Sequence, residues 1–381
     1  MRIVVVTSAT LPPREGIGYY VENLARQYVR LGHDVKIVSR KGKFRGGDSL
    51  SSEISRIELS PIPIPPFHVD AMELQLKCIL GDLAPRPDLI HYHSPLVPCI
   101  RSDIPTVVTF HSPMQSGVSA MEHSSMHYVA STLMLKVSSL RHEKKLLEYA
   151  DAVTTVSDSV TKAICSPPYS AEKLKVETIG NGVDTEYFTP DERRREDKSV
   201  FWAGRLAPGK GIEDLVKIAH EAMAIDPETR FRVAGEGPLR EHLARSLKKH
   251  GLQRSVALLG HLQTSEMVEE YQRASILLIT SHYEGMSTVM LEAMSCETPC
   301  LCTRVGSALE VIRDGDNGYL VNSGSAQEVA ERISMILGQR SHVRELIGKK
   351  ARETVVKNHC WPVIGQKYQN TLMRITKAEV K

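Results

Sequence analysis

The stretch that decides the fold of this chain runs from residue 274 to residue 294 and reads ASILLIT followed by SHYEGMSTVMLEAM. Its first part, Ala274–Thr280, is mostly aliphatic, as expected for a strand buried on both faces of a parallel sheet. The remainder predicts a glycine-containing turn and then a helix. Glu284 lies on the turn, and Glu292 is expected to point inward from the second or third turn of the helix. Between the two carboxylates, the helix N-terminus offers backbone N–H groups to an anion.

This segment therefore suits a ligand that carries both phosphates and hydroxyls. The N–H groups and the dipole of a helix N-terminus favour phosphate, whereas carboxylates accept hydrogen bonds from hydroxyl groups. A nucleotide sugar carries both kinds of group, and we expect a ligand of this class.

Short aliphatic runs alternate with amphipathic segments along the rest of the chain, which predicts parallel sheets covered by helices. In the first half, strands are expected at residues 3–7, 34–39, 89–92, 106–110, 152–156 and 176–179, with helices such as 17–31 and 122–149 between them. After the charged run 191–198, strands are expected at residues 199–203, 230–234, 256–259, 275–280, 299–303 and 318–320. The pattern predicts an α/β fold of two doubly wound, Rossmann-like domains.

A chain of 381 residues is also too long for one ordinary hydrophobic core. We expect a first domain over residues 1–183, a second over 184–357, and a final helix within 358–381 that crosses back onto the first domain. Ligands of doubly wound sheets bind at the carboxyl ends of the strands. The expected site is therefore a cleft across which the two domains face each other.

Composition excludes several classes of protein. Hydrophobic residues make up 41% and charged residues 24% of the chain, as in ordinary globular proteins. The net charge of +3 is too small to indicate a nucleic-acid-binding protein. The seven cysteines lack paired spacing, and Cys300 and Cys302 lie inside an expected buried strand, so reduced thiols are expected.

No signal-peptide pattern precedes the first strand, and no apolar run approaches the roughly 18–20 residues that span a membrane. We therefore expect a cytoplasmic protein. A basic cluster could be a solvated loop, or it could place the protein peripherally on the cytoplasmic face of a membrane through anionic lipid. Its members are Lys36, Arg40, Lys41, Lys43 and Arg45.

Two cations flank the loop that opens the second half, FWAGRLAPGKG at residues 201–211. Arg205 comes just after an expected strand, and Lys210 comes just before the next helix. An arginine gives a diphosphate a bidentate fork and a lysine gives it a mobile point charge. Such charges would stabilise a leaving diphosphate as its negative charge grows. The alternative is that both are exposed loop charges.

Histidines and glycines follow strand ends in the first half. Gly16 and Gly18 lie between the first strand and a helix and would let a phosphate or sugar approach the backbone. His111 ends a strand and is the histidine expected to contact a ligand, whereas one of His91 and His93 is expected to be an interior histidine. A third metal ligand with suitable geometry is not identifiable, so we expect no metal.

Two other nucleotide-binding motifs are incomplete or missing. Gly235-Glu236-Gly237-Pro238 begins like a dinucleotide fingerprint, but a third glycine is missing and proline takes a turn position. The sequence has no Gly-x4-Gly-Lys-Ser/Thr loop, which argues against a Walker-type ATPase.

In their order and spacing, these motifs resemble those of retaining glycosyltransferases of family 4, which have the two-domain GT-B fold. The resemblance covers nearly the whole chain. Its motifs are Gly16–Gly18, Phe110-His111, Val156-Ser157, Gly180–Asp184, Gly204-Arg205 with Lys210-Gly211, Gly235–Pro238, and Glu284-x7-Glu292.

The resemblance implies a role for each predicted site residue. Arg205 and Lys210 would hold the donor diphosphate, and Glu292 would bond the ribose hydroxyls. Glu284 would bond the transferred sugar, and His111 would contact that sugar near the reacting centre. The other implied donor-binding positions are Gly16, Gly18, Gly235, Gly285, Met286, Ser287, Thr288 and Val289.

The family mechanism implies front-face displacement, in which the leaving phosphate accepts the proton of the acceptor, so no metal or cofactor is expected. This chain departs from the family at Gly16-Ile17-Gly18, where Gly-Gly is frequent, and at Gly285-Met286-Ser287, where Gly-Phe-Gly is frequent. Ser287 is expected to bring a hydroxyl beside the sugar. The donor base, the sugar and the acceptor therefore remain open.

The sequence leads us to expect a retaining hexosyltransferase that moves a sugar from a UDP- or GDP-sugar to a hydroxyl of a glycan, a lipid-linked acceptor or a small molecule. The segment 128–137, followed by Arg141, Lys144 and Lys145, would suit a lipid-linked acceptor or would be an ordinary buried helix. Two alternatives are a nucleotide-dependent epimerase or dehydrogenase and a non-catalytic sugar-nucleotide sensor.

Overall fold

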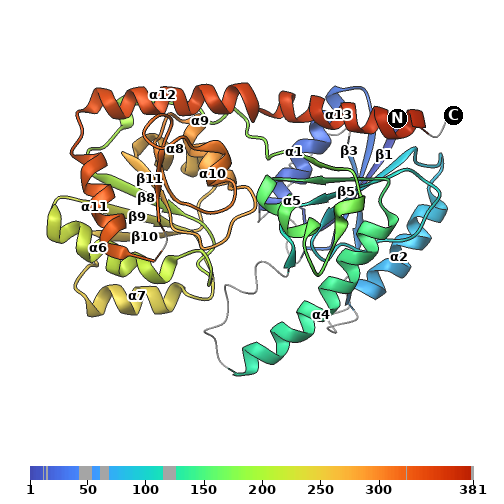
Figure 1. Ribbon diagram of the computed structural model, residues 1–381, viewed down its shortest axis with the longest axis horizontal. Coiled ribbons are helices and arrows are strands. Elements are labelled where there is room, and N and C mark those ends of the chain that lie inside the picture. The colour runs from blue at the N-terminus through green and yellow to red at the C-terminus, as the bar shows by residue number, and fades with distance from the viewer. Residues whose placement is uncertain are drawn as a thin grey trace. The chain divides into compact units, whose positions relative to one another are not determined.

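The computed structural model describes residues 1–11, 13, 16–42, 54–60, 68–114, 126–322 and 324–378 (Figure 1). The chain forms two compact units. Unit 1 consists of Met1–Asn181 together with Trp361–Lys381, and unit 2 consists of Gly182–Cys360.

Unit 1 is built on a seven-stranded parallel sheet with the order β3-β2-β1-β4-β5-β6-β7. The strands are β1 (Arg2–Thr10), β2 (Asp34–Arg40), β3 (Ile54–Leu59), β4 (Leu89–Ser94), β5 (Thr106–Phe110), β6 (Ala152–Thr155) and β7 (Val176–Thr178). The order reverses between β1 and β4, so this sheet is doubly wound, as the sequence predicts. The six expected strands of the first half are confirmed.

The helices of unit 1 are α1 (Gly16–Arg30), α2 (His68–Asp82), α4 (Met126–Tyr149), α5 (Asp158–Cys165) and α13 (Trp361–Ala378), with a 3-10 turn at Ala171–Lys173. α13 belongs to this unit because its apolar face is buried in the core of unit 1. Trp361, Ile364, Tyr368 and Leu372 recur at helical spacing and pack with Tyr20 and Tyr28 of α1. Burying each such side chain stabilises the unit by roughly 1.5–3 kcal/mol.

Unit 2 is built on a six-stranded parallel sheet with the order β10-β9-β8-β11-β12-β13. The strands are β8 (Ser199–Ala203), β9 (Arg230–Ala234), β10 (Val256–Gly260), β11 (Ile276–Ile279), β12 (Cys300–Thr303) and β13 (Tyr319–Val321). The six predicted strands of the second half are therefore confirmed. Their aliphatic composition follows from burial, because helices cover both faces of the sheet (Figure 1).

The helices of unit 2 are α6 (Ile212–Ile225), α7 (Arg240–Lys249), α8 (Thr264–Arg273), α9 (Thr288–Ser295), α10 (Ala308–Val311), α11 (Ala326–Leu337) and α12 (Ser341–Asn358), with a 3-10 turn at Glu192–Arg194. α6 packs against α7 and α11 on one face of the sheet, while α9 packs against α8 and α12 on the other (Figure 1). The two doubly wound units establish the α/β, Rossmann-like fold class that the sequence predicts.

Some expectations differ from the structure. β3 was not expected, because ISRIEL is not an aliphatic run but the sequence of an edge strand, with only its two terminal residues buried. The proline-rich segment 61–66 and residues 122–125 of the expected helix lie outside the described residues.

Candidate active site

The predicted donor-binding residues of unit 2 follow the two strands at which its sheet reverses. β8 and β11 are neighbours, and the helices that follow them, α6 and α9, lie on opposite faces of the sheet. The loop after β8 carries Arg205 and Lys210, and the loop after β11 carries Glu284 and Ser287. In a doubly wound sheet, ligands bind at this point, outside the carboxyl ends of the strands, because the two following helices lie on opposite faces of the sheet.

Glycines bring these loops into direct contact. A Cβ atom on Gly211 would lie 2.0 Å from the carbonyl oxygen of Thr280, so the β8 and β11 loops touch through backbone atoms. A Cβ on Gly235 would lie 1.9 Å from the carbonyl oxygen of Gly204, which joins the β9 loop to the β8 loop in the same way. Neither approach leaves room for a side chain, and both glycines have positive φ angles, of +68° and +132°. Gly235, expected at the donor, therefore also packs two site loops together.

Hydrogen bonds fix the backbone beside Lys210. The indole Nε1 of Trp202 donates to Thr280 Oγ1 over 3.1 Å, and that hydroxyl donates to the carbonyl oxygen of Lys210 over 3.0 Å. The N–H of His282 donates to the carbonyl oxygen of Gly209 over 2.9 Å. Thr280 is thus a bridge between the β8 and β11 loops. This role could not be predicted, because the sequence shows Thr280 only as the last residue of a buried strand.

Two of the predicted site residues form an ion pair with each other. Lys210 Nζ lies 2.7 Å from Glu284 Oε2, and the side chains retain 35% and 18% of their exposure. The exposed Arg205 has no side-chain hydrogen bond or ion pair within the described residues. A mobile ammonium, a carboxylate and an unengaged guanidinium therefore lie on adjoining loops, as an anionic ligand with hydroxyl groups would require.

The N-terminus of α9 completes this group of charges. Ser287 is its N-cap, and the Ser287 hydroxyl accepts a hydrogen bond from the N–H of Met290 over 3.4 Å. The N–H of Ser287 donates to Ser307 Oγ over 3.3 Å. The next two N–H groups, those of Thr288 and Val289, precede the first intrahelical bonds and can face an anion. The Ser287 hydroxyl, expected beside the sugar, caps the helix and retains its proton for a second contact.

Glu292 lies one turn further along α9 and is paired with a residue that the sequence did not single out. The hydroxyl of Tyr271, at the end of α8, donates to Glu292 Oε2 over 2.7 Å. Burial raises the pKa of the Glu292 carboxyl to about 7, although the bond from Tyr271 favours the charged form. Tyr271 and Glu292 are far apart in sequence, and a tyrosine near a helix end carries no motif that could have revealed the contact.

In unit 1, His111 follows β5 and is buried beside other aromatic residues. Its Nε2 lies 3.1 Å from Nδ1 of His93, and its ring meets the edge of Tyr20 at a centroid distance of 4.6 Å. Burial lowers the pKa of His111 to about 3 and that of His93 well below its usual value. Both imidazoles are therefore neutral at physiological pH.

The expectation that only one of His91 and His93 faces the interior is wrong. Residues two apart on a strand share a face, and both rings are fully buried with centroids 4.2 Å apart. Helices cover both faces of this sheet, so neither the His91 nor the His93 side chain reaches solvent. His91 Nδ1 lies 3.0 Å from the Tyr28 hydroxyl, and its Nε2 lies 2.7 Å from Thr109 Oγ1. Burial lowers the pKa of His91 to about 3.

Gly16 and Gly18 form the first turn of α1. A Cβ on Gly18 would lie 2.8 Å from Cβ of Pro13, so α1 starts in close contact with the segment that follows β1. Thus Gly18 allows a backbone approach, as the sequence suggests. Residues 12, 14 and 15 of the same loop lie outside the described residues.

Comparison with known families decides the class of protein. The family model "Glycosyl transferases group 1" matches residues 183–354, and the model "Glycosyltransferase Family 4" matches residues 14–187. Together they cover nearly all of both units. The chain belongs to glycosyltransferase family 4. The predicted GT-B fold and glycosyltransferase class are thereby confirmed, and the epimerase or dehydrogenase alternative is set aside.

One relative supports the same class, and two solved structures share the fold. D-inositol 3-phosphate glycosyltransferase of Corynebacterium aurimucosum is 28% identical over 378 residues, which span 88% of each chain. Sucrose-phosphate synthase from Thermosynechococcus elongatus has the same fold, with a TM-score of 0.83 at 22% identity over 99% of this chain and 100% of that one. Anabaena HepE, solved with UDP-glucose, has a TM-score of 0.74 at 18% identity over 98% and 100% of the two chains.

A buried carboxyl supports the segment that follows His111 in this glycosyltransferase. Glu143 of α4 accepts a hydrogen bond from the N–H of Met114 over 3.2 Å and another from the hydroxyl of Tyr169. Burial raises the pKa of Glu143 to about 7. Glu143 was not among the predicted site residues, because a glutamate within a charged helix is typically exposed to solvent.

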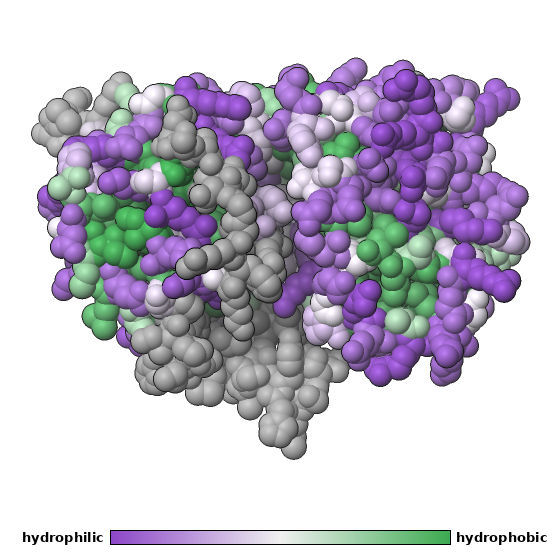
Figure 2. Space-filling model, turned by 180° about the vertical axis from the view of Figure 1, so that it is seen from behind, coloured by the Kyte–Doolittle hydropathy of each residue, from purple (hydrophilic) through white to green (hydrophobic). Residues whose placement is uncertain are grey.

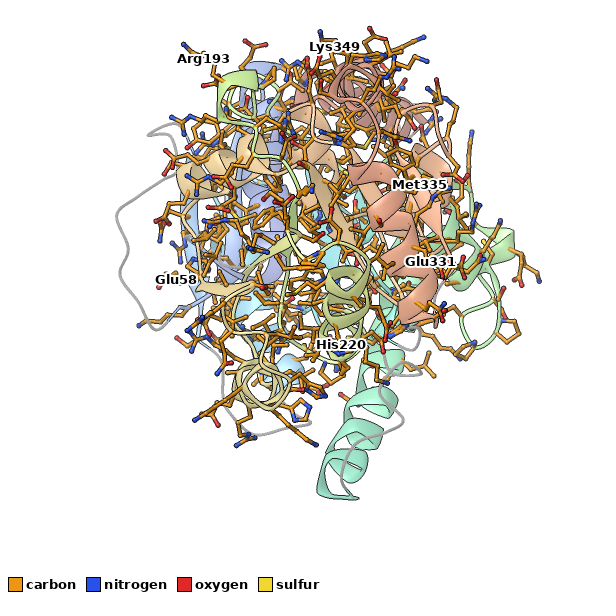
Figure 3. All side chains as sticks on the ribbon, turned by 90° about the vertical axis from the view of Figure 1, so that its left-hand side faces the viewer. Glu58, Arg193, His220, Glu331, Met335 and Lys349 are labelled. Carbon is orange, nitrogen blue, oxygen red and sulfur yellow. The ribbon has the colours of Figure 1, made fainter. Side chains whose placement is uncertain are left out.

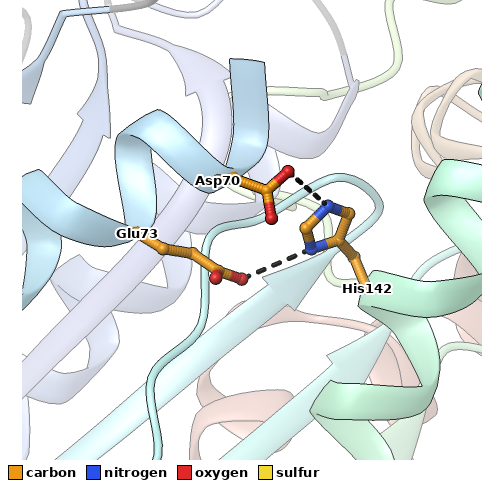
Figure 4. A group of neighbouring side chains, drawn as sticks. All are labelled: Asp70, Glu73 and His142. Carbon is orange, nitrogen blue, oxygen red and sulfur yellow. Dashed lines mark ion pairs between the residues drawn. The ribbon is translucent and has the colours of Figure 1, made fainter. Parts of the chain in front are cut away.

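One cluster in the described ranges, Asp70, Glu73 and His142, has the composition of a metal site (Figure 4). Its geometry is that of an ion-pair cluster. Asp70 approaches Nε2 of His142 at 3.7 Å, whereas Glu73 approaches the other ring nitrogen, Nδ1, at 3.3 Å. Both oxygens of Glu73 also bond Lys145 Nζ, at 2.6 and 2.9 Å. One metal ion cannot bind both nitrogens of a ring. We therefore infer that the role of this cluster is to hold α2 against α4.

Most of the described surface on the face drawn in Figure 2 is hydrophilic, with smaller separate hydrophobic areas on each unit. Charged residues such as Glu58, Arg193, Glu331 and Lys349 lie exposed at the surface (Figure 3). No helix within the described residues is long and apolar enough to cross a membrane. Of the basic cluster, Lys43 and Arg45 lie outside the described residues, as do the side chains of segment 128–137.

Proposed function

We propose that this glycosyltransferase moves a sugar from a nucleotide-diphosphate sugar, with UDP- and GDP-sugars as the first candidates, to an acceptor hydroxyl with retention of anomeric configuration. The observation that carries the proposal is the Lys210–Glu284 ion pair of 2.7 Å, which joins the loop that leads into α6 to the loop that leads into α9. The pair would offer a cation to phosphate and a carboxylate to sugar hydroxyls, next to helix N–H groups that attract an anion.

The roles follow from the charges. Lys210, Arg205 and the N–H groups of Thr288 and Val289 would hold the diphosphate. As the bond between the anomeric carbon and the phosphate oxygen breaks, negative charge gathers on that oxygen, where fixed cations and N–H groups stabilise it most. Glu284 would accept hydrogen bonds from the transferred sugar, and Glu292 from the ribose. Arg205 and Lys210 would take the place of a metal ion at the diphosphate. We therefore expect turnover to persist in the presence of a chelator.

In this mechanism, the acceptor hydroxyl attacks from the face that the diphosphate leaves. The new bond joins the acceptor oxygen to the anomeric carbon, and the proton of the hydroxyl passes to the leaving phosphate oxygen. The neutral His111 would then be a hydrogen-bonding partner of the sugar rather than a general acid, since its pKa of about 3 leaves it unprotonated.

The relatives support the donor class and leave the acceptor open. HepE was solved with UDP-glucose, and the relative from Corynebacterium acts on an inositol phosphate by its name. The acceptor proposed here is a hydroxyl of a glycan, a lipid-linked molecule or a small molecule, and contact with a membrane surface would accompany the lipid-linked case. We place the enzyme in the cytoplasm.

A panel of UDP-, GDP- and ADP-sugars tests the donor class. A ligand that binds the folded state raises the apparent melting temperature, and at 100 times its Kd it stabilises by about 2.7 kcal/mol. We expect the nucleotide sugars of one base to stabilise the wild type. At least one of them should also be hydrolysed slowly without acceptor. The released sugar should keep the anomeric configuration of the donor by NMR. Stabilisation without any turnover would indicate the non-catalytic sensor, and inversion would refute the retaining mechanism.

The raised pKa of Glu292 predicts the pH dependence of donor use. The ionised carboxylate accepts stronger hydrogen bonds from the ribose hydroxyls than the neutral acid does, so kcat/KM for the donor should rise with pH through about 7. Between pH 6 and pH 8 we expect a rise of roughly five- to tenfold. Glu292→Gln should flatten the profile at a low value, while Glu331→Gln on the exposed face of α11 should leave it unchanged. A wild-type profile without an ionisation near 7 would contradict the assignment of Glu292.

A further inference from the structure

The contact between Tyr271 and Glu292 has geometric features that a simple packing contact would not require. The Tyr271 hydroxyl donates to Oε2 of Glu292 over 2.7 Å. Within the described residues, the other oxygen, Oε1, has no hydrogen-bond donor, and it is not among the buried unsatisfied atoms. The tyrosine thus occupies one side of the carboxylate and leaves the other side open to a ligand.

Tyr271 is held in place from several directions. Its side chain has no exposed surface, and its ring meets Phe201 at 5.5 Å and Phe188 at 6.1 Å between centroids. Its backbone carbonyl accepts a hydrogen bond from Thr298 Oγ1 over 2.6 Å. A hydroxyl on so rigid a ring fixes the rotamer of the carboxylate to which it donates, because Glu292 would lose a charge-assisted bond by turning away.

The vicinal hydroxyls of a ribose need two acceptor positions on the carboxylate. An ionised carboxylate has about four lone-pair positions, of which Tyr271 uses one on Oε2. The two ribose hydroxyls are then left mainly with Oε1, whose direction is set by the bond on the opposite side. A nucleotide that lacks one of these hydroxyls would leave part of the charge of a largely enclosed carboxylate unpaired, which is costly.

We propose that Tyr271 is a positioning residue that aims Oε1 of Glu292 at the ribose and thereby makes the donor site select ribonucleotides over deoxyribonucleotides. The inference rests on the proposed function, in which Glu292 binds the ribose. It adds a residue that does not itself contact the donor but determines how selectively the site binds ribose rather than deoxyribose.

The test compares Tyr271→Phe with wild type in calorimetric titrations of a nucleoside diphosphate and its 2′-deoxy and 3′-deoxy analogues. The probe is whichever of UDP, GDP and ADP binds wild type most tightly. Wild type should prefer the ribonucleotide at least about tenfold, since hydrogen bonds to a charged group are strong. Tyr271→Phe should weaken ribonucleotide binding by roughly five- to twentyfold and deoxynucleotide binding by less than about twofold. Its preference should therefore nearly disappear.

A further readout and a matched control separate positioning from packing. Loss of the hydroxyl removes a group that favours the charged carboxylate, so the midpoint of the pH dependence of ribonucleotide affinity should move to higher pH in Tyr271→Phe. Tyr319→Phe is the matched control, because Tyr319 is a buried tyrosine of β13 in the same unit and donates to Gln339 Oε1 over 2.6 Å. It should change neither the preference nor the midpoint.

The outcomes distinguish this inference from the proposed function. If wild type discriminates against the deoxy analogues and Tyr271→Phe discriminates equally well, the inference fails while the donor site stands. Equal weakening of both nucleotide types in Tyr271→Phe overturns it too, because that result shows general damage. If wild type itself does not discriminate and Glu292→Gln binds normally, the placement of ribose at Glu292 fails, and the inference fails with it.

Discussion

Replacing Arg205 with alanine should lower kcat/KM for the donor by roughly 30- to 1000-fold, a loss of about 2–4 kcal/mol of transition-state stabilisation. The residue follows β8 at the reversal of the unit 2 sheet, and its exposed guanidinium has no side-chain partner in the described part of the chain. Its loss should therefore leave the fold intact. The cost arises because a diphosphate gains charge as it leaves, and a bidentate fork stabilises that charge most in the transition state.

Steady-state kinetics of purified variants with the identified donor measure this effect. Arg205→Lys keeps the charge but not the fork, so we expect an intermediate rate. Arg240→Ala is the matched control, since Arg240 is exposed and pairs with Glu236 of the adjoining β9 loop at 3.2 Å. It should stay within about twofold of wild type, as a surface ion pair contributes little. Near-normal turnover of Arg205→Ala at saturating donor would refute the assignment of the diphosphate.

The second large effect is acid sensitivity of unit 1. Burial lowers the pKa of His91 and of His111 to about 3, and that of His93 well below its usual value. In the unfolded chain, each would titrate near 6.5. The stability due to these neutral histidines is fully present above pH 6.5 and is lost as the pH falls, because only the unfolded state then binds the three protons.

Glu143 acts in the opposite direction. Its raised pKa of about 7 means that the folded state takes up one proton before the unfolded state does, as the pH falls from 7 toward 4.5. For these four buried groups of unit 1, three histidine protons minus one carboxyl proton leave a net uptake of two on unfolding. These four groups should therefore lower the free energy of unfolding of unit 1 by about 3 kcal/mol per pH unit between pH 6 and pH 4.5. This fall is a large part of the total free energy of unfolding of a protein, which is about 5–15 kcal/mol.

Urea unfolding at several pH values tests this prediction. His93→Asn cannot take up a proton but keeps a polar group near Nδ1, so the slope should decrease by about 1.4 kcal/mol per pH unit. His220→Asn is the control, because His220 is an exposed residue of α6 and should leave the slope unchanged (Figure 3). An unfolding free energy that stays constant from pH 6 to pH 4.5 would contradict the neutral, buried state of the three histidines.

The fold was predictable because burial on both faces of a parallel sheet leaves long aliphatic runs. VVV at residues 4–6 and ILLI at residues 276–279 could hardly be anything but interior strands. β3 was not predicted, because an edge strand does not need a long aliphatic run. The switch-point loops were predictable for a related reason, since a strand, a glycine turn and a helix N-terminus follow one another in the sequence.

Contacts between distant segments were not predictable. Nothing in the sequence around Lys210 or Glu284 shows that these residues pair, because the contact depends on Gly211 bringing the β8 loop against the carbonyl of Thr280. The bond from Tyr271 to Glu292 likewise depends on how α8 and α9 pack. The error at His91 and His93 was of another kind, since a strand period of two already places both on one face.

The most direct test of the account is the affinity of the wild-type enzyme for nucleoside diphosphates compared with the matching monophosphates, measured by calorimetry for uridine, guanosine and adenosine. For at least one base, we expect the diphosphate to bind roughly 30-fold or more tightly, because Arg205, Lys210 and the N-terminus of α9 recognise the second phosphate. In Arg205→Ala the ratio should fall to a few-fold. Equal affinity for the mono- and diphosphate of every base would contradict a nucleotide-sugar site in unit 2.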